Sequence, residues 1–100
     1  MRMMLKAHLD VEAANLAIGD GSIAKVFDTV FGLCRPEATW FLTEGGQRTC
    51  YAIFDMQEPA IIPELAEPLF QSLGATVDFH PVMSAAELET GLKGWAARRS

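Results

Sequence analysis

The stretch Ala38–Phe54, ATWFLTEGGQRTCYAIF, sets two runs of β-branched and aromatic residues on either side of a Gly-Gly dipeptide. Residues 38–43 and 49–54 have the composition of strands. Gly45 and Gly46 supply the positive φ angles that a tight hairpin turn needs. We therefore expect a β-hairpin here. Both strands are apolar at consecutive positions, so they predict a sheet that is covered on both faces.

The chain before this hairpin predicts one strand and two helices. Residues Met3–Leu9 alternate between apolar and mixed side chains, which is typical of a strand. Asp10 is a good N-cap for a short helix that ends at Gly19–Gly21. Ser22 is then expected to cap a second helix, and Pro36 to end it, because the residue before a proline is disfavoured in the α conformation.

The chain after the hairpin predicts helix, strand and helix. Residues 62–73 carry an apolar stripe at helical spacing, with Gly74 as the C-terminal stop. Pro68 is expected to kink this helix or to hold its first turn apart. Residues 76–82 alternate as a strand does, and Ser84–Glu87 form a capping box that begins a last helix.

This order of elements predicts an α+β fold of the ferredoxin-like βαββαβ type. The right-handed crossover rule puts the first and third strands in the centre of a four-stranded antiparallel sheet. We expect the two main helices on one face of the sheet and an extra helix at the C-terminus. Because the sequence contains no repeat, linker or low-complexity tract, residues 1–100 are interpreted as a single domain.

Composition predicts self-association. Half of the 100 residues are hydrophobic and 21% are charged, which is rather apolar for a chain with so little interior. Packing the second apolar face of the hairpin strands against another copy would remove a large exposed patch. We therefore expect a homodimer through the sheet face. The alternative is that the C-terminal helix, which carries Trp95, covers that face.

Charge and cysteine usage argue against several other partners. A net charge of −5 disfavours nucleic acid, since phosphate binding needs clustered Lys and Arg. No apolar run reaches the length of a membrane span, and Lys6 interrupts the N-terminal one. Cys34 and Cys50 are isolated and are interpreted as reduced, buried thiols. We expect a cytoplasmic protein without a nucleic-acid or membrane partner.

The outer pair of strands carries the polar constellation of greatest interest. Lys6 and His8 share one face of the first strand, and Asp78 and His80 share one face of the last. Residues directly opposite each other in an antiparallel pair point to the same side. Two registers remain open: either His8 faces Asp78 and Lys6 faces His80, or Lys6 faces Asp78. A His–Asp pair in an aromatic cavity would suit acid–base chemistry or ligand binding, and a solvated strand edge is the alternative.

Trp40 and Tyr51 are candidates for lining the same cavity. A shift of the hairpin register by one residue would turn both side chains to the other face, so either one can belong to the core instead. Two histidines without a third ligand at suitable spacing do not make a metal site, and the sequence has no nucleotide-binding, zinc-binding or nucleophile-elbow motif. We expect no metal and no cofactor.

The sequence resembles a bacterial family of uncharacterised domains of about this length. The resemblance rests on the glycine-turn hairpin ending in Phe54-Asp55-Met56, the proline-bearing helix IPELAEPLF at 62–70 and the closing Pro81-Val82-Met83. It implies a place among the dimeric α+β barrels. That superfamily includes cofactor-independent monooxygenases, isomerases, haem-handling enzymes and proteins without known activity, so the resemblance implies a fold and a dimer but no reaction.

Three functions follow as hypotheses. The first is a dimeric small-molecule binding or regulatory domain with an apolar cavity against the sheet. The second is a small cofactor-independent enzyme that uses His8, Asp78 and His80. The third is a structural protein-interaction module. The first two differ in whether the polar side chains converge in a closed pocket.

Overall fold

The computed structural model describes residues 1–99. Its four strands form one antiparallel sheet in the order β2-β3-β1-β4. In chain order the elements are β1 (Arg2–His8), α1 (Val11–Asp20), α2 (Ser22–Cys34), β2 (Ala38–Glu44), β3 (Gln47–Asp55), α3 (Ile61–Leu73), β4 (Thr76–Pro81) and α4 (Ala85–Arg99).

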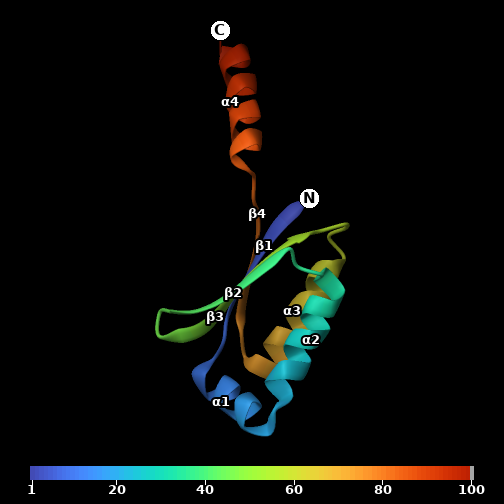
Figure 1. Cartoon of the computed structure of the whole chain (residues 1–100), viewed down its shortest axis with the longest axis vertical. Coiled ribbons are helices and arrows are strands. Elements are labelled where there is room, and N and C mark those ends of the chain that lie inside the picture. The colour runs from blue at the N-terminus through green and yellow to red at the C-terminus, as the bar shows by residue number, and fades with distance from the viewer. Residues whose placement is uncertain (100) are drawn as a thin grey trace.

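The predicted α+β class and the central positions of the first and third strands are confirmed. Helices α1, α2 and α3 lie on one side of the sheet, whereas α4 extends away from it (Figure 1). We call the side of the sheet away from α1–α3 the open face. Strand alternation and the register give its residues as Arg2, Met4, Lys6, His8, Ala38, Trp40, Leu42, Glu44, Gln47, Thr49, Tyr51, Ile53, Asp55, Thr76, Asp78 and His80.

The core lies between the other face of the sheet and the three helices. β1 sends every second side chain into it, as its alternating burial shows, whereas the edge strand β2 has no buried residue. Its largest fully buried side chains are Phe54, Leu5, Leu65, Leu69, Leu73, Val30 and Cys50. The aromatic ring of Phe79 from β4 meets Phe54 edge-on at 6.4 Å between centroids, which extends the core to the outer strand.

The hairpin forms as predicted. β2 and β3 pair from Ala38 opposite Ile53 to Glu44 opposite Gln47, and the turn consists of Gly45 and Gly46 alone. Their φ angles are 62° and 77°, which side chains rarely adopt. The turn fixes the register, so the face that each aromatic residue of the hairpin takes is determined by this dipeptide.

One local expectation is wrong, and one of the two alternatives at Pro68 is excluded. Ser22 is the first residue of α2 rather than its cap: the preceding residue, Gly21, is left-handed at φ 81° and provides no side chain, and the Ser22 N–H donates to Asp20 Oδ1 at 2.8 Å. α3 also continues through Pro68 as one helix, so the first turn is not held apart.

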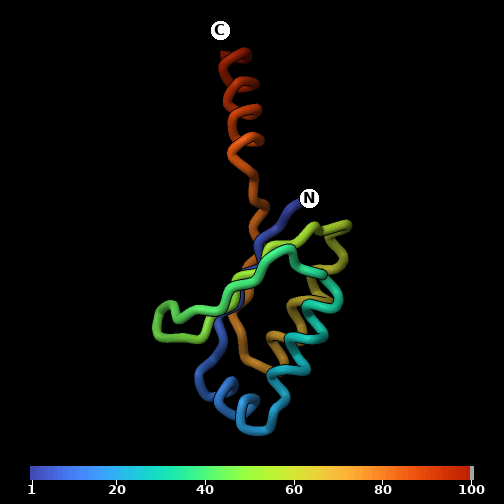
Figure 2. Tube along the Cα trace, viewed as in Figure 1, coloured from blue at the N-terminus to red at the C-terminus, as the bar shows by residue number. Residues whose placement is uncertain are grey.

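α4 begins as predicted but does not cover the sheet of its own chain. The capping box forms, with the Glu87 N–H donating to Ser84 Oγ at 3.2 Å and the Ser84 N–H donating to Glu87 Oε1 at 2.8 Å. No residue of α4 is buried within the described part of the chain. The helix continues in the direction of β4 beyond the end of the sheet (Figure 2).

Within residues 1–99, no helix combines the length and hydropathy that crossing a bilayer requires.

The core assignment predicts a contrast between two leucines that both lie in helices. Leu69→Ala in α3 removes a side chain with no exposure, and we expect it to lower the free energy of unfolding by about 2–5 kcal/mol. Leu16→Ala in α1 changes a side chain that is 74% exposed, and we expect an effect within about 0.5 kcal/mol. Urea denaturation followed by circular dichroism measures both. Equal losses would contradict this core.

Candidate functional site

The carboxylate of Glu44 is the centre of a polar cluster on the open face. At the end of β2 it lies 2.6 Å from His8 Nε2 and accepts a hydrogen bond of 2.7 Å from the Tyr51 hydroxyl. The Nζ atom of Lys6 lies 3.5 Å from the same carboxylate. Because an ionised carboxylate can only accept, His8 Nε2 carries the proton of their bond. Three strands therefore contribute to one cluster.

Each member of the cluster changes the proton affinity of another. The hydrogen bonds from Tyr51 and then His8 lower the pKa of Glu44, with Lys6 adding to the effect. The same bond to Glu44, together with partial burial, raises the pKa of the Tyr51 phenol. Desolvation opposes the charge on Lys6, but the combined attraction of Glu44 and Tyr51 outweighs it and raises the pKa of that ammonium. The cluster holds a carboxylate, a phenol and an ammonium in their ordinary charge states at neutral pH.

The second of the two predicted registers of the outer strands is the one that forms. Lys6 lies opposite Asp78, and Met4 rather than Lys6 lies opposite His80. The expected partner of Asp78 is nevertheless missing among the described residues, since the Lys6 ammonium turns toward Glu44 on the other side. Asp78 and His80 are both exposed on the edge strand β4. The predicted His–Asp pair is therefore not formed.

Trp40 and Tyr51 lie directly opposite each other on the open face. Lys6 sits opposite Tyr51 from the other side, with its Nζ 5.4 Å from the ring centroid, so a cation–π contact adds to the polar cluster. The Trp40 side chain is 55% exposed. Four of the six predicted site residues are thus neighbours, whereas Asp78 and His80 stand apart at the other edge.

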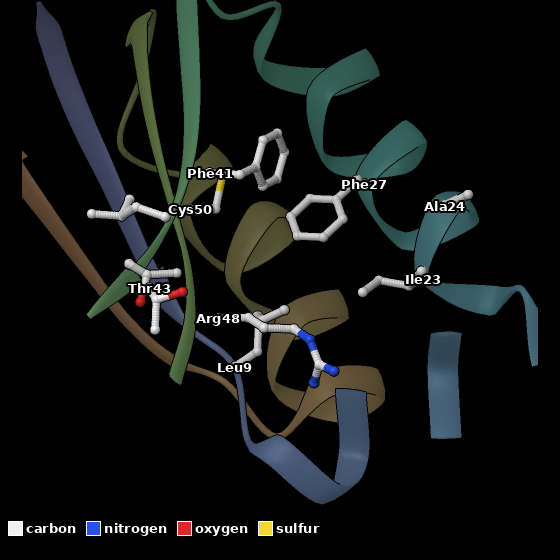
Figure 3. Close-up of a pocket in the computed structure, with 10 residues that line it drawn as sticks. Leu9, Ile23, Ala24, Phe27, Phe41, Thr43, Arg48 and Cys50 are labelled. Carbon is white, nitrogen blue, oxygen red and sulfur yellow. The ribbon is translucent and has the colours of Figure 1, made fainter. Parts of the chain in front are cut away.

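The pocket lies on the opposite side of the sheet from all six predicted residues. This β2–α2 pocket is a cavity of about 460 Å³ between the hairpin and α2, with a predominantly apolar wall. Figure 3 shows the rings of Phe27 and Phe41 reaching toward each other across it. Its lining consists of Leu9, Ile23, Ala24, Phe27, Phe41, Leu42, Thr43, Arg48, Thr49 and Cys50, of which Leu42 and Thr49 belong to the open face by register and also border the pocket.

Two phenylalanines, Phe27 and Phe41, line the β2–α2 pocket, and a third, Phe31, packs against both. The rings of Phe27 and Phe41 meet edge-to-face at 5.5 Å between centroids, and Phe31 lies 5.4 Å from Phe27 and 6.3 Å from Phe41. Such contacts hold the rings in place. Phe41 remains 62% exposed, because it projects from the outer strand past the edge of α2 (Figure 3). A large aromatic surface therefore stays available to a ligand.

Arg48 provides the charged group at the rim of the pocket. It follows the hairpin turn on the helix side of β3 and extends toward α1 (Figure 3). Its Nη2 atom donates to Asn15 Oδ1 at 3.0 Å, and it forms no ion pair among residues 1–99. Cys50 lies deeper, where burial raises the pKa of the thiol to about 11. The pocket thus combines an apolar wall, an inert thiol and one guanidinium without a counter-ion.

Sequence reasoning missed Glu44 and the pocket for different reasons. Glu44 lies just outside the predicted strand 38–43, although in β2 it shares a face with Trp40, four residues away along the strand. The pocket residues Phe27 and Phe41 come from the second predicted helix and the first hairpin strand, to which no cavity was assigned. The alternation that puts Trp40 on one face necessarily puts Phe41 on the other, which is the signal that was available.

The Glu44 cluster predicts a titration change when one donor is removed. In Tyr51→Phe the strongest hydrogen bond to Glu44 is lost, so we expect the pKa of Glu44 to rise toward its ordinary value. Carboxyl-detected NMR titration measures it. Asp20, whose pKa is lowered by Ser22 in a different part of the chain, is the internal control and should not change. An unaltered Glu44 titration would show that the Tyr51 bond is not formed in solution.

A scan against protein-family models finds none that matches this chain, and a search of curated proteins finds no match either.

Proposed function

We propose that this protein is a small-molecule binding domain whose ligand occupies the β2–α2 pocket. The observation that carries the proposal is the composition of this cavity of about 460 Å³, in which aromatic and aliphatic side chains surround a few polar groups. Ligand sites are typically concave, apolar and supplied with a small number of orienting polar groups. The edge-to-face contact of Phe27 with Phe41 and the tilted contact of Phe27 with Phe31 support a preformed rather than a collapsed cavity.

The chemistry of the rim favours a ligand with an apolar body and one anionic group. Arg48 is the charged residue of the lining, and its hydrogen-bond partner Asn15 is neutral. A guanidinium binds a carboxylate or phosphate through two parallel hydrogen bonds. An aromatic or aliphatic carboxylate would therefore place its body against the rings of Phe27 and Phe41 and its charge on Arg48.

Two naphthalene probes test this proposal. We expect the wild type to bind anionic 1-anilinonaphthalene-8-sulfonate and neutral N-phenyl-1-naphthylamine, both detected by fluorescence. Arg48→Met should weaken the anionic probe about tenfold, as loss of a charge-assisted hydrogen bond does, and leave the neutral probe unchanged. Equal binding of the anionic probe by Arg48→Met would refute the role of the guanidinium.

A filled-pocket variant locates the binding. Ala24→Phe adds a ring to a residue that lines the pocket, and we expect both probes to be lost. Thr29→Phe makes a comparable change on an exposed residue of α2 outside the pocket, and it should bind both probes as the wild type does. Probe binding that survives Ala24→Phe would assign it to another surface.

We also propose that the chain forms a homodimer through the open face. Trp40 and Leu42 are 55% and 38% exposed there, beside the partly buried Met4, Tyr51 and Ile53. A contiguous apolar patch of this kind is typical of an interface between subunits.

The dimer is tested by sedimentation at micromolar concentration. We expect the wild type to sediment as a dimer and Trp40→Glu as a monomer, because the substitution would bury a charge at the interface. Leu16→Glu is the control, since Leu16 is more exposed but lies on α1, away from the open face. A monomeric wild type would overturn the homodimer.

We propose more specifically that the fold is ferredoxin-like and belongs among the dimeric α+β barrels. The central positions of β1 and β3 and the three helices on one face support it. A bacterial origin rests on the sequence resemblance alone. Cys34 and Cys50 are free and buried, which supports a cytoplasmic compartment, where thiols stay reduced.

The enzyme and interaction-module hypotheses stay predictions. The contact of His8 with Glu44 supports an acid–base site on the open face, and the exposed Trp95 supports an interaction surface. We favour a binding domain because the β2–α2 pocket is lined by none of the candidate acid–base residues Lys6, His8, Asp78 and His80.

A further inference from the structure

α4 is a helix without any packing surface of its own. It spans 15 residues, none of them buried, and gives the molecule its long axis of 60 Å against 28 and 18 Å for the other two. Figure 1 shows it standing clear of the sheet and of the other helices. Isolated helices of this length are marginal in water, and Gly91 and Gly94 each weaken it by about 1 kcal/mol relative to alanine. A stable α4 therefore needs contacts from outside the chain described so far.

One face of α4 is suited to such a contact. Leu88, Leu92 and Trp95 follow each other at spacings of four and three residues, so they form a stripe along the helix. Their side chains are 48%, 56% and 59% exposed. Gly91 lies between them on the same face, one turn from Leu88 and from Trp95, and nothing lies within 4 Å of where its Cβ would be. A glycine at this place allows a flat surface to approach the helix closely.

The connection from β4 prevents α4 from folding back onto its own sheet. The Val82 N–H donates to the carbonyl of Arg2 at 3.1 Å, so the chain is still tied to β1 at this residue. Ser84 is already fixed as the helix cap by its two bonds with Glu87. Only Met83 lies between these two anchored residues, and the chain continues from β4 into α4 without turning back toward the sheet (Figure 1). In this arrangement a packing surface for α4 has to come from another molecule.

The open face of a second copy fits α4 in both polarity and charge. Its exposed Trp40 and Leu42 provide an apolar surface against which the stripe of α4 can pack. Arg98 and Arg99 make the end of α4 basic, because no acidic residue follows Glu89 and that residue pairs with Lys93. The open face in turn carries Asp78, which has no ion pair among the described residues.

We propose that α4 of each copy lies across the open face of the other, so that the two chains exchange their C-terminal helices. The inference rests on the homodimer proposed above, and it specifies that the open face of each copy is covered by α4 of the other. The stripe of Leu88, Leu92 and Trp95 contacts the apolar residues around Trp40, and the basic end of α4 lies toward the carboxylate of Asp78. Each helix gains the packing that its own chain does not provide.

The two tryptophans of the chain make the exchange measurable, since Trp40 and Trp95 lie on the two proposed contact surfaces. In full-length Trp40→Phe, Trp95 is the sole tryptophan. At concentrations where light scattering reports a dimer, we expect its emission to be blue-shifted and its acrylamide quenching constant to be severalfold lower than in dilute monomer. Adding Leu42→Glu on the open face should restore quenching, whereas Leu16→Glu on α1 should not.

Four other results would each contradict the proposed exchange of helices, and each would identify a different reason. A dimer in which Trp95 stays fully quenchable keeps the homodimer but removes α4 from it. Protection of Trp95 that persists in dilute monomer means that α4 folds back on its own chain. Protection that resists Leu42→Glu means that α4 pairs with α4 of the second copy. A monomer at every concentration refutes the homodimer itself.

Discussion

Successive side chains of the hairpin strands point to opposite faces of the sheet, and both the pocket and the open face depend on this alternation. The turn of Gly45 and Gly46 allows a single register, and this register directs Trp40 and Tyr51 to one side of the sheet and Phe41 and Cys50 to the other. Both sides are apolar, so one hairpin contributes apolar residues to two different surfaces. Its helix side builds the β2–α2 pocket, and its open side builds the interface that we propose. A shift by one residue would exchange the two sets and remove both surfaces.

The sequence was sufficient for the order of elements and for the two central strands because its local signals agree with one another. Asp10, the Gly-Gly turn, Gly74 and the Ser84–Glu87 box each begin or end an element where expected. Ser22 failed as a cap because Gly21 adopts the left-handed conformation that ends α1, and that residue then also precedes α2. With no loop between the two helices, there was no separate position for a cap.

The candidate site was less predictable because the ammonium of Lys6 has several neighbours with which it could pair. Lys6 faces Asp78 on one neighbouring strand and Tyr51 on the other, and register alone does not decide between them. Tyr51 and His8 hold Glu44 at the end of β2, where the ammonium meets a carboxylate that is less exposed than that of Asp78. Partial exclusion of water strengthens that attraction relative to a surface pair. The edge carboxylate of Asp78 is left for solvent or for another chain.

The pocket and the open face make different demands on the same strands. A ligand site needs β2 to be held against α2, and the contacts of Phe41 with Phe27 and Phe31 supply this from the helix side. β2 is nevertheless an edge strand, with only β3 beside it, and edge strands are the first to separate from a sheet. A second copy on the open face would press β2 against the helices from the other side. Dimer formation and ligand binding would then stabilise the same strand, so each would strengthen the other without any contact between their surfaces.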